Sequence, residues 1–399
     1  MSAGLTSSAV VAPPPKPLLP GATLGVMGGG QLGRMFVHAA QRMGYFTAVL
    51  DPDATSPAGR VSHVHVATDY LDEKGLARLA AESAAITTEF ENVPAAAMDR
   101  LARERFVAPG AAALAIAQDR AREKAHFTRC GVPCAPYAVI ETEAQLAAVP
   151  DALLPGILKT ARLGYDGKGQ ARVADRAALA VAWAGLGRAP CVLEQMLPLA
   201  FECSVVVARG ADGAMVHLPV QRNLHREGIL AVTEVFEDAV PASTAAQAIE
   251  ATRAIAEGLG YVGVLCVEFF GLKDGRLVVN EMAPRPHNSG HWSIEGADVS
   301  QFELQVRTLA GLPLVAPRQH SPAIMLNLLG DLWFRAGSEA VTPDWASVLA
   351  LPGTHLHLYG KASARPGRKM GHLTVTGASV AQVRATALRA ADRLGIAPF

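Results

Sequence analysis

Two acidic side chains, Glu268 and Glu281, occupy neighbouring segments whose composition predicts a β-hairpin. Residues 264–270 and 276–281 are apolar, β-branched and aromatic, which is typical of strands. Asp274-Gly275 lies between them and favours a two-residue turn, which fixes the register of the two strands. Counting outward from that turn places Glu268 directly opposite Glu281, on one face of the sheet.

Directly opposed carboxylates destabilise a strand pair, so this arrangement calls for an explanation. The register can differ from the one counted, one carboxyl can be protonated, or the two groups can share divalent cations. We favour shared cations. Oxygen ligands suit Mg²⁺, which usually arrives bridging the phosphates of a substrate. Glu268 and Glu281 therefore predict a nucleotide close by.

A glycine-rich loop between Leu163 and Gln170 is a candidate cover for such phosphates. Its three glycines at alternating positions exclude a packed helix or strand. Lys159 ends the preceding strand, residues 156–159, and Lys168 lies inside the loop. We therefore favour a flap over phosphates, with an ordinary glycine hairpin as the alternative. The loop is not a Walker loop, because the Gly-Lys-Ser/Thr ending is missing.

The segment after Glu281 is too rich in proline, glycine and polar donors for regular structure. Arg285, His287 and Asn288 crowd the end of the strand that carries the candidate metal ligand. An arginine offers a planar fork of donors to a carboxylate-shaped group, so this loop suits an oxyanion such as bicarbonate. The alternative is a solvated surface loop.

A second basic loop runs from Lys361 through Arg368 and Lys369. Glycine and proline restrict it, which favours a phosphate site over a solvated run of charge. Just before it, His355 and His357 alternate with leucines and fall on one strand face. We favour structural or solvent-facing roles for these histidines over metal ligation.

The N-terminal part carries a dinucleotide-binding fingerprint. A strand at 23–27 leads into Gly28-Gly-Gly-Gln-Leu-Gly33, a helix at 35–43, and a strand at 45–50 that ends in Asp51. Taken alone this predicts a dehydrogenase, but the same unit serves any phosphate-bearing ligand, and a structural tight turn is a further alternative. A buried strand at 85–93 then delivers Glu89 and Glu91 to the sheet edge where open α/β sheets bind ligands. The sequence does not decide which of the two contacts a substrate.

The remaining pattern supplies further strands and helices. Expected strands cover 191–197, 203–209 and 213–220; expected helices cover 111–130, ended by Gly131-Val-Pro133, and 242–259; a polar turn is expected at 222–228. The exit of the strand at 191–197 can offer backbone groups to a flat heterocycle. Glu194 or Glu202 can meet ribose hydroxyls there.

Composition indicates an ordinary globular protein. With 399 residues, 50% of them hydrophobic, the chain can bury a large core and divides into two or three domains. Lys plus Arg equals Asp plus Glu at 36 each, so no overall field favours nucleic acid or an anionic membrane. Five scattered cysteines fit reduced thiols better than disulfides. We read residues 1–20 as a disordered leader, find no membrane span, and expect a cytoplasmic protein.

Four motifs together resemble the 5-(carboxyamino)imidazole ribonucleotide synthetase family, ATP-grasp enzymes of purine biosynthesis. They are Gly-Gly-Gly-Gln-Leu-Gly-Arg, Gly-Tyr-Asp-Gly-Lys-Gly-Gln, Asn-Glu-Met-Ala-Pro-Arg-Pro-His-Asn-Ser-Gly-His-Trp and Arg-Pro-Gly-Arg-Lys-Met-Gly-His. The resemblance covers nearly everything after residue 20. It implies an α/β ATP-grasp fold, α+β in its C-terminal part. The implied domains are a Rossmann-like domain at 21–120, a lid at 121–200, and a C-terminal domain at 201–399 with a small subdomain from about 352.

The resemblance also implies roles for individual residues, matched motif by motif. The residues implied to bind ATP are Arg120, Lys159, Gly164, Tyr165, Asp166, Gly167, Lys168, Gly169, Gln170, Glu194, Gln195, Met196, Leu197, Glu202, His225, Asn280 and Glu281. Glu268 and Glu281 match magnesium ligands, in agreement with the hairpin count. The residues implied in catalysis are Asp166, Lys168, Arg285, His287, Asn288 and Lys361; those implied to bind the ribonucleotide are Gly30, Gln31, Leu32, Glu89, Lys361, Arg368 and Lys369. Lys168 is often arginine in the family.

The chemistry implied by the resemblance uses ATP, two Mg²⁺ ions and bicarbonate. Bicarbonate attacks the γ-phosphate and forms carboxyphosphate. Carboxyphosphate, or carbon dioxide released from it, then carboxylates the exocyclic amine of 5-aminoimidazole ribonucleotide, and Asp166 orients that amine or accepts its proton. A homodimer is expected from the family. The alternatives are another ATP-grasp ligase, such as a formate-dependent ribonucleotide transformylase or a biotin carboxylase-like enzyme, an NAD-dependent dehydrogenase, and a nucleotide-binding sensor without turnover.

Overall fold

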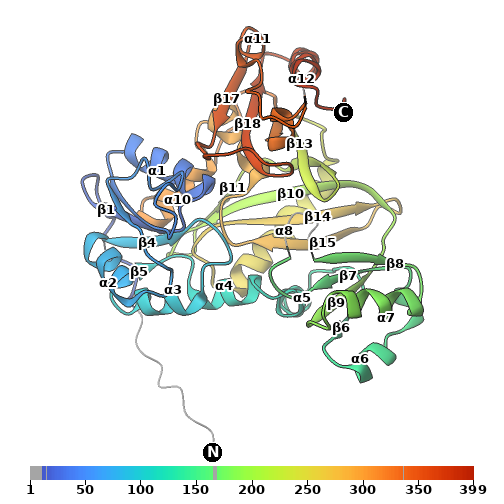
Figure 1. Cartoon of the computed structure of the whole chain (residues 1–399). Coiled ribbons are helices and arrows are strands. Elements are labelled where there is room, and N and C mark those ends of the chain that lie inside the picture. The colour runs from blue at the N-terminus through green and yellow to red at the C-terminus, as the bar shows by residue number, and fades with distance from the viewer. Residues whose placement is uncertain (1–10, 15, 165–168, 336) are drawn as a thin grey trace, which may run out of the picture.

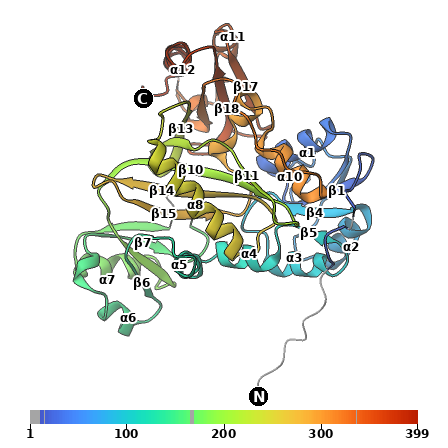
Figure 2. The same cartoon turned by 180° about the vertical axis from the view of Figure 1, so that it is seen from behind.

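The computed structural model describes residues 11–14, 16–164, 169–335 and 337–399. Within these ranges the chain forms a parallel sheet near the N-terminus, a small antiparallel sheet, and a long antiparallel sheet (Figure 1). Seen from behind, helix α8 (Ala242–Gly258) crosses one face of the long sheet (Figure 2). Each sheet has its own apolar core.

The N-terminal sheet has the strand order β3-β2-β1-β4-β5, with every pair parallel. Its elements are β1 (Thr23–Met27), α1 (Gln31–Arg42), β2 (Phe46–Leu50), β3 (Val64–Val66), α2 (Glu73–Glu82), β4 (Ala85–Thr88), α3 (Ala95–Ala102) and β5 (Phe106–Val107). The expected βαβ unit is present. The expected strand at 85–93 is shorter than predicted, so Glu89 and Glu91 lie beyond its carboxyl end.

Residues 111–130 form two helices where we expected one. Helix α4 (Ala111–Ala117) stops at Gln118, and α5 (Arg120–Arg129) begins after Asp119. The Asp119 carboxylate accepts hydrogen bonds from the amides of Ala121 and Arg122, which caps the new helix. The prediction missed this break because alanine-rich sequence continues to either side of it.

The small sheet lies at lower right in Figure 1, in the segment for which we expect a lid. Its elements are β6 (Tyr137–Ile140), α6 (Glu143–Ala147), the short 3₁₀ helix η1 (Asp151–Leu153), β7 (Gly156–Thr160), β8 (Gln170–Val173), α7 (Arg176–Gly185) and β9 (Cys191–Gln195). The strand order is β6-β9-β7-β8. The glycine-rich loop joins β7 to β8, and its residues 165–168 lie outside the described residues.

The long sheet has the order β15-β14-β10-β12-β13-β16-β18-β17, with β11 beside β10. Its strands are β10 (Leu199–Arg209), β11 (Met215–His217), β12 (Gln221–Arg226), β13 (Ile229–Val235), β14 (Gly263–Leu272), β15 (Leu277–Ala283), β16 (Ala323–Leu329), β17 (Thr354–Leu358) and β18 (Lys369–Thr376). The prediction of a polar turn over residues 222–228 is wrong. Most of that segment is β12, and the turn itself is confined to Glu227 and Gly228, both with positive φ.

The remaining elements follow β15 and cover the sheet near its C-terminal end. They are η2 (Asn288–Gly290), α9 (Ser293–Gly296), α10 (Gln301–Ala310), η3 (Gly330–Trp333), α11 (Trp345–Leu349) and α12 (Val380–Leu394). Helix α10 packs against α1, so the N-terminal sheet is attached to the long sheet through these two helices. Among the described residues, no helix is long and apolar enough to cross a membrane.

Glu268 and Glu281 are paired across β14 and β15, as the hairpin count predicted. The turn used for that count is wrong, however. The amide of Leu272 bonds to the carbonyl of Arg276 across a loop that spans 273–275, one residue longer than expected. A register shift between Glu268 and Phe269 then leaves Asn280 as the extra residue on β15. The two offsets cancel, which restores the predicted pair.

The prediction that residues 1–20 are a disordered leader is wrong for residues 11–14 and 16–20, which the structure describes. The amide of Val11 donates to the carbonyl of Ala102, and that of Leu18 donates to the carbonyl of Ala310. The Tyr45 hydroxyl donates to the carbonyl of Leu18 at 2.6 Å. Leu18 also packs on the core between α1 and α10, and these apolar contacts hold the segment in place. Residues 1–10 and 15 lie outside the described residues.

Candidate active site

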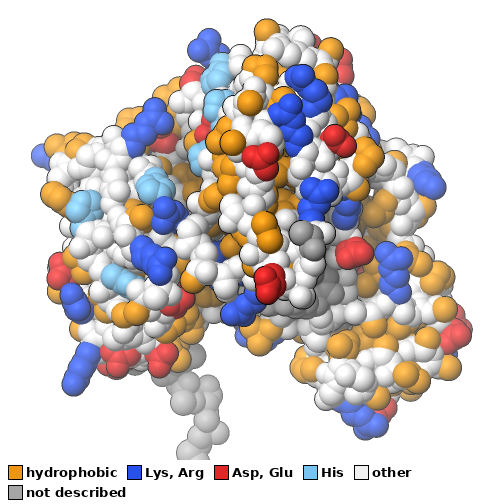
Figure 3. Space-filling model, turned by 45° about the horizontal axis from the view of Figure 1, so that its top comes forward, with side chains coloured by type: hydrophobic (Ala, Val, Ile, Leu, Met, Phe, Trp, Pro, Cys, Tyr) orange, Lys and Arg blue, Asp and Glu red, His pale blue; other side chains and the backbone are white. Residues whose placement is uncertain are grey.

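Two cavities meet at the Glu268 and Glu281 pair. The larger, of about 510 Å³, lies between the lid strand β7 and the long sheet. The smaller, of about 140 Å³, lies toward the N-terminal sheet. Both are lined by Arg120, His225, Gly228, Glu268 and Glu281. Figure 3 shows charged side chains of both signs around the separation between the lid, at lower right, and the body of the molecule.

Glu268 is held between two histidines. Its Oε1 lies 2.9 Å from Nε2 of His287, and its Oε2 lies 3.9 Å from Nε2 of His225. Burial by itself would raise the pKa of Glu268, but His287 and His225 offset burial and hold that pKa at about 2. His225 in turn contacts Glu202 at 2.5 Å. Glu268 is therefore an ionised carboxylate at the junction of the two cavities.

Helix α5 supports the second carboxylate. Arg120 donates to Oε2 of Glu281 at 3.0 Å. One turn later, Oε1 of the buried Glu123 accepts the backbone amide of Met282 at 2.7 Å. Burial, with Glu281 close by, raises the pKa of Glu123 to about 8. The helix thus fixes both the side chain of Glu281 and the backbone that follows it.

A buried ion triad lies behind the larger cavity. Nζ of Lys159 donates a hydrogen bond to Oε2 of Glu194 at 3.0 Å, and Nζ of Lys124 forms an ion pair with Oε1 at 3.0 Å. Lys159 also lines the cavity. Sequence analysis missed Lys124, which is 1% exposed. The sequence feature that could have identified Lys124 is its position one helical turn after Arg120, next to Phe127 on the buried face of α5. Of the two candidates for ribose contact, only Glu202 lines the cavity.

The larger cavity has one apolar part and one polar part. Ile157, Leu199 and Phe270 form apolar walls, which the sequence analysis did not single out because such residues are indistinguishable from core. At the polar end, Oδ1 of Asn280 is buried with no hydrogen-bond partner among the described residues. Gly169 and Gln170 reach the same cavity from the glycine-rich loop. A flat heterocycle fits the apolar part, and phosphates fit the polar part.

The smaller cavity is lined by a partly buried ion pair between Glu91 and Arg285. Burial would raise the pKa of Glu91, but the Arg285 guanidinium offsets this and holds it at about 2. His287 and Lys369 line the same cavity. Nδ2 of the buried Asn288 has no hydrogen-bond partner among the described residues, so it is a donor available to an anion.

The glycine-rich turn before α1 is wrapped around carboxylates. The amide of Gly29 donates to Asp51 at 2.7 Å, and the amides of Gly30 and Gly33 donate to Glu89 at 2.7 and 3.0 Å. A phosphate at these amides would have to displace the carboxylates. Glu91, and not Glu89, lines the smaller cavity. Gly30, Gln31 and Leu32 lie at the start of α1. That these three residues contact the substrate stays a prediction.

The other predicted residues fall into three groups. Nζ of Lys361 donates to the carbonyl of Lys369 at 2.6 Å, and Arg368 donates to the carbonyl of Ser363 at 2.7 Å, so the basic loop is internally bonded. Among the described residues, the linings of the two cavities do not include Gln195, Met196 or Leu197. Gln195 and Leu197 instead line a separate groove beside β15. Predictions for Tyr165, Asp166, Gly167 and Lys168 lie outside the described residues.

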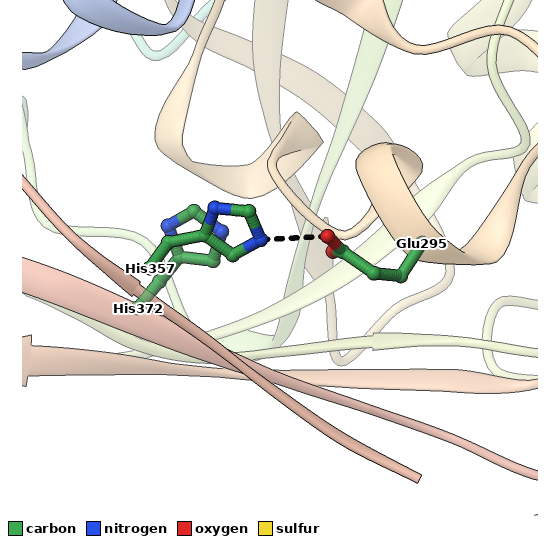
Figure 4. A group of neighbouring side chains, drawn as sticks. All are labelled: Glu295, His357 and His372. Atoms are coloured by element: carbon green, nitrogen blue, oxygen red, sulfur yellow. Dashed lines mark hydrogen bonds and ion pairs between the residues drawn. The ribbon is translucent and has the colours of Figure 1, made fainter.

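A further polar cluster lies near the basic loop (Figure 4). Nε2 of His357 contacts Oε1 of Glu295 at 2.6 Å, and the rings of His357 and His372 are stacked at 4.5 Å with an interplanar angle of 9°. These three residues have metal-ligand atoms within 4.8 Å of one another. A ring nitrogen binds a metal in its own plane, and one ion cannot lie in two parallel planes. The arrangement therefore corresponds to a hydrogen-bonded pair of His357 and Glu295, with the His372 ring stacked on His357.

Sequence-family models match most of the chain. An ATP-grasp domain matches residues 125–302, a ribonucleotide synthetase preATP-grasp domain matches 21–118, and a phosphoribosylaminoimidazole carboxylase C-terminal domain matches 323–386. The second range covers the N-terminal sheet, the first covers the small sheet and strands β10 to β15 of the long sheet, and the third covers strands β16 to β18 of that same long sheet.

Curated relatives from several bacteria share one name. N5-carboxyaminoimidazole ribonucleotide synthase from Brucella melitensis is 46% identical over 90% of this chain and 97% of its own length. The protein of that name from Bacillus subtilis is 39% identical over 90% and 92%.

Solved structures agree. An N5-carboxyaminoimidazole ribonucleotide synthetase in complex with ADP superposes with a TM-score of 0.87 at 35% identity, over 96% of this chain and 98% of that one. An Aspergillus clavatus enzyme with ADP and 5-aminoimidazole ribonucleotide has a TM-score of 0.85 at 30% identity, over 94% and 99%.

Proposed function

The chain belongs to the N5-carboxyaminoimidazole ribonucleotide synthase family of ATP-grasp ligases, and from this we propose how its two cavities divide the reactants. It is an ATP-dependent carbon–nitrogen ligase of purine biosynthesis that carboxylates 5-aminoimidazole ribonucleotide. The resemblance found in the sequence is confirmed. The dehydrogenase alternative is wrong, and the carboxylates bonded to the amides of Gly29, Gly30 and Gly33 give the physical reason.

In our proposal the larger cavity holds ATP. The apolar walls of Ile157, Leu199 and Phe270 take the adenine, and Glu202 accepts hydrogen bonds from the ribose. Lys159 and the backbone of the glycine-rich loop contact the phosphates. Arg120, already within 3.0 Å of Glu281, approaches the terminal phosphate from the junction. The observation that carries the proposal is that both cavities open onto the same pair of carboxylates.

Glu268, Glu281 and Asn280 are the residues that would hold Mg²⁺. The set is all oxygen, and Oδ1 of Asn280 is a buried acceptor without a partner among the described residues, so it suits a ligand of a hard cation. When bound there, two Mg²⁺ ions would offset the charge that spreads over the phosphoryl oxygens. Glu281 is 41% exposed in its side chain, so its carboxylate can turn from Arg120 toward an ion.

The smaller cavity receives bicarbonate and the ribonucleotide. Arg285, His287 and Asn288 bind bicarbonate, so that its oxygen attacks the γ-phosphorus as ADP leaves. The amine of the ribonucleotide then attacks the carboxyl carbon of carboxyphosphate, and inorganic phosphate leaves. Asp166 accepts the amine proton, and Lys168, Lys361, Arg368 and Lys369 supply positive charge for the substrate phosphate. The closed lid keeps water from carboxyphosphate.

The test is ADP release with bicarbonate present, measured with and without 5-aminoimidazole ribonucleotide. We expect turnover that depends on both bicarbonate and the ribonucleotide, and a product labelled by ¹³C-bicarbonate on the exocyclic nitrogen. Full turnover without the ribonucleotide, or no turnover with it, would contradict the proposal. A homodimer and a cytoplasmic location are part of the same proposal, and sedimentation velocity measures the first.

A further inference from the structure

The short hairpin that joins β12 to β13 lies where the two cavities meet. Its turn consists of Glu227 and Gly228, and Arg226 pairs with Ile229 across that turn. Glu227 lines the larger cavity, and Gly228 lines both cavities. His225, which comes directly before Arg226, lines both as well. The position of this hairpin therefore sets the shape of the space between the two cavities.

The hairpin has few contacts of its own that fix its position. Glu227 and Gly228 are exposed, and their φ angles are 51° and 79°, a conformation that a glutamate rarely adopts. The pairing of β12 with β13 also shifts register between Leu224 and His225, just before the turn. An exposed turn with few apolar contacts opens locally at low cost. Contacts from other elements therefore decide how the hairpin is held.

Arg226 makes such a contact with the segment that follows α12. Its Nη1 donates to the carbonyl of Ala397 at 3.0 Å, and its Nη2 donates to the carbonyl of Pro398 at 2.8 Å. The end of the chain lies beside β13 in both views (Figure 1 and Figure 2). A planar guanidinium that bonds two successive carbonyls is fixed in direction as well as in distance.

The segment that accepts these bonds is itself anchored. Ile396 and Phe399 pack against the apolar cluster beneath α12, and the amide of Ile396 donates to the carbonyl of Ala391 at 2.8 Å. Phe399 also lines a cavity of about 370 Å³ that shares no lining residue with the two cavities of the site. Ala397 and Pro398 are therefore held between two anchored side chains.

We infer that Arg226 is a positioning residue for the nucleotide, because its bonds to residues 397 and 398 hold the 225–228 hairpin in the conformation that receives ATP. Arg226 itself lines neither cavity, so it acts through its neighbours in the hairpin. The identity of the nucleotide rests on the proposed function, in which ATP occupies the larger cavity. The contact between Arg226 and residues 397 and 398 does not depend on that assignment.

Hydrogen exchange of the full-length protein without nucleotide tests the contact. Arg226→Met keeps much of the side-chain stem and removes both donors, so we expect the amides of residues 226–230 to exchange about 5- to 10-fold faster. Arg226→Lys can bond one carbonyl at a time and should lie between Arg226→Met and wild type. Phe399→Ala weakens the anchor of the accepting segment and should accelerate exchange in the same residues.

Nucleotide binding tests the consequence for the site. We expect the dissociation constant for ADP, measured by titration calorimetry, to rise about 5- to 10-fold in Arg226→Met, because the competent conformation is populated less. Arg226→Lys should recover part of the loss. KM for ATP should rise by the same factor as the dissociation constant while kcat at saturating ATP is retained, whereas general damage to the fold would lower kcat as well.

Arg105→Met is the matched control. Arg105 likewise donates to two backbone carbonyls, those of Ser83 and Glu104, and it lines neither cavity. We expect Arg105→Met to match wild type both in exchange of residues 226–230 and in affinity for ADP.

Unchanged exchange of residues 226–230 in both Arg226→Met and Phe399→Ala would overturn the inference. Faster exchange with unchanged affinity for ADP would overturn the positioning role. Glu202→Ala, which removes the proposed ribose acceptor, separates this result from a failure of the proposed function. If affinity for ADP falls in Glu202→Ala alone, only the inference is wrong. If it falls in neither variant, the placement of ATP in the larger cavity is wrong as well.

Discussion

At the scale of single residues, the site is organised by charges whose partners come from different elements. Glu268 is neutralised by two histidines, Glu281 by Arg120, Glu194 by two lysines, and Glu91 by Arg285. An ionised group buried without a partner is costly, so the pairs made by the buried Glu268 and Glu194 are kept while reactants are absent. Ligands would enter by exchanging partners with these charged groups, most readily at Glu281, whose side chain is 41% exposed.

The first prediction concerns Glu281. Glu281→Gln keeps the size of the side chain and removes the negative charge proposed to face Mg²⁺. We expect kcat to fall about 10²- to 10³-fold, as when one electrostatic contact to a transition state is removed, with little change in melting temperature. Steady-state ADP release and thermal unfolding measure the two quantities. Glu303→Gln, which breaks a partly buried ion pair with Arg307 within α10, is the control. Near-normal turnover of Glu281→Gln would show that the metal assignment is wrong.

At the scale of elements, the bulge in β15 decides what the metal site contains. Alternate residues of a regular strand face opposite sides, so Asn280 and Glu281 could not both face one cavity. The extra residue in β15 turns both side chains to the larger cavity while Val279 stays in the core. Helix α5 then holds the strand end through the bond from Met282 to Glu123.

The second prediction tests the role of this bulge. Asn280→Ala removes the unpaired Oδ1 and leaves the Glu268 and Glu281 pair in place. We expect the apparent affinity for Mg²⁺ to fall about tenfold at saturating ATP, with kcat at high Mg²⁺ largely restored. A titration of activity against free Mg²⁺ measures this. Asn280→Asp, which keeps an oxygen at the same position, should retain tight binding. Identical Mg²⁺ curves for Asn280→Ala and wild type would exclude Asn280 as a ligand.

At the scale of the whole molecule, the site is assembled from all three sheets. The lid contributes Lys159, the long sheet contributes both carboxylates, and the N-terminal sheet contributes Glu91. The pair between Glu91 and Arg285 joins residues 194 positions apart and ties the N-terminal sheet to the loop after β15. Docking of the domains and formation of the smaller cavity therefore depend on the same contact.

The third prediction is a pH dependence of this contact. The folded pKa of Glu91 is about 2, below the ordinary value of about 4.3 for an unfolded chain. The stabilisation it provides is therefore complete above the unfolded pKa and is lost as pH falls through about 4 toward 2. We expect Glu91→Gln to melt below wild type at pH 7, with a difference that narrows steadily toward pH 3.

Thermal unfolding between pH 7 and pH 3 measures that difference. Glu104→Gln, at an exposed pair with Arg100, should show little difference at any pH. A difference in melting temperature between Glu91→Gln and wild type that stays constant down to pH 3 would show that ionisation of Glu91 does not stabilise the docked domains.

The sequence by itself determined the local features of this protein and their chemistry. Strand and helix patterns located β1, β7 and α8 closely, and the residue types after Glu281 indicated an oxyanion loop. The hairpin pair of Glu268 and Glu281 was predicted correctly, although through two errors in register that cancel. These features depend on neighbours along the chain, so local propensity suffices to find them.

Only the tertiary structure decided which distant groups meet. The sequence could not show that Lys124 shares Glu194 with Lys159, that Glu91 rather than Glu89 lines the smaller cavity, or that Arg226 bonds to the carbonyl of Pro398. It also could not show that the glycine-rich turn is filled by Glu89. Such contacts join residues tens to hundreds of positions apart. They are fixed by strand order and domain docking, which burial of apolar surface selects for the chain as a whole.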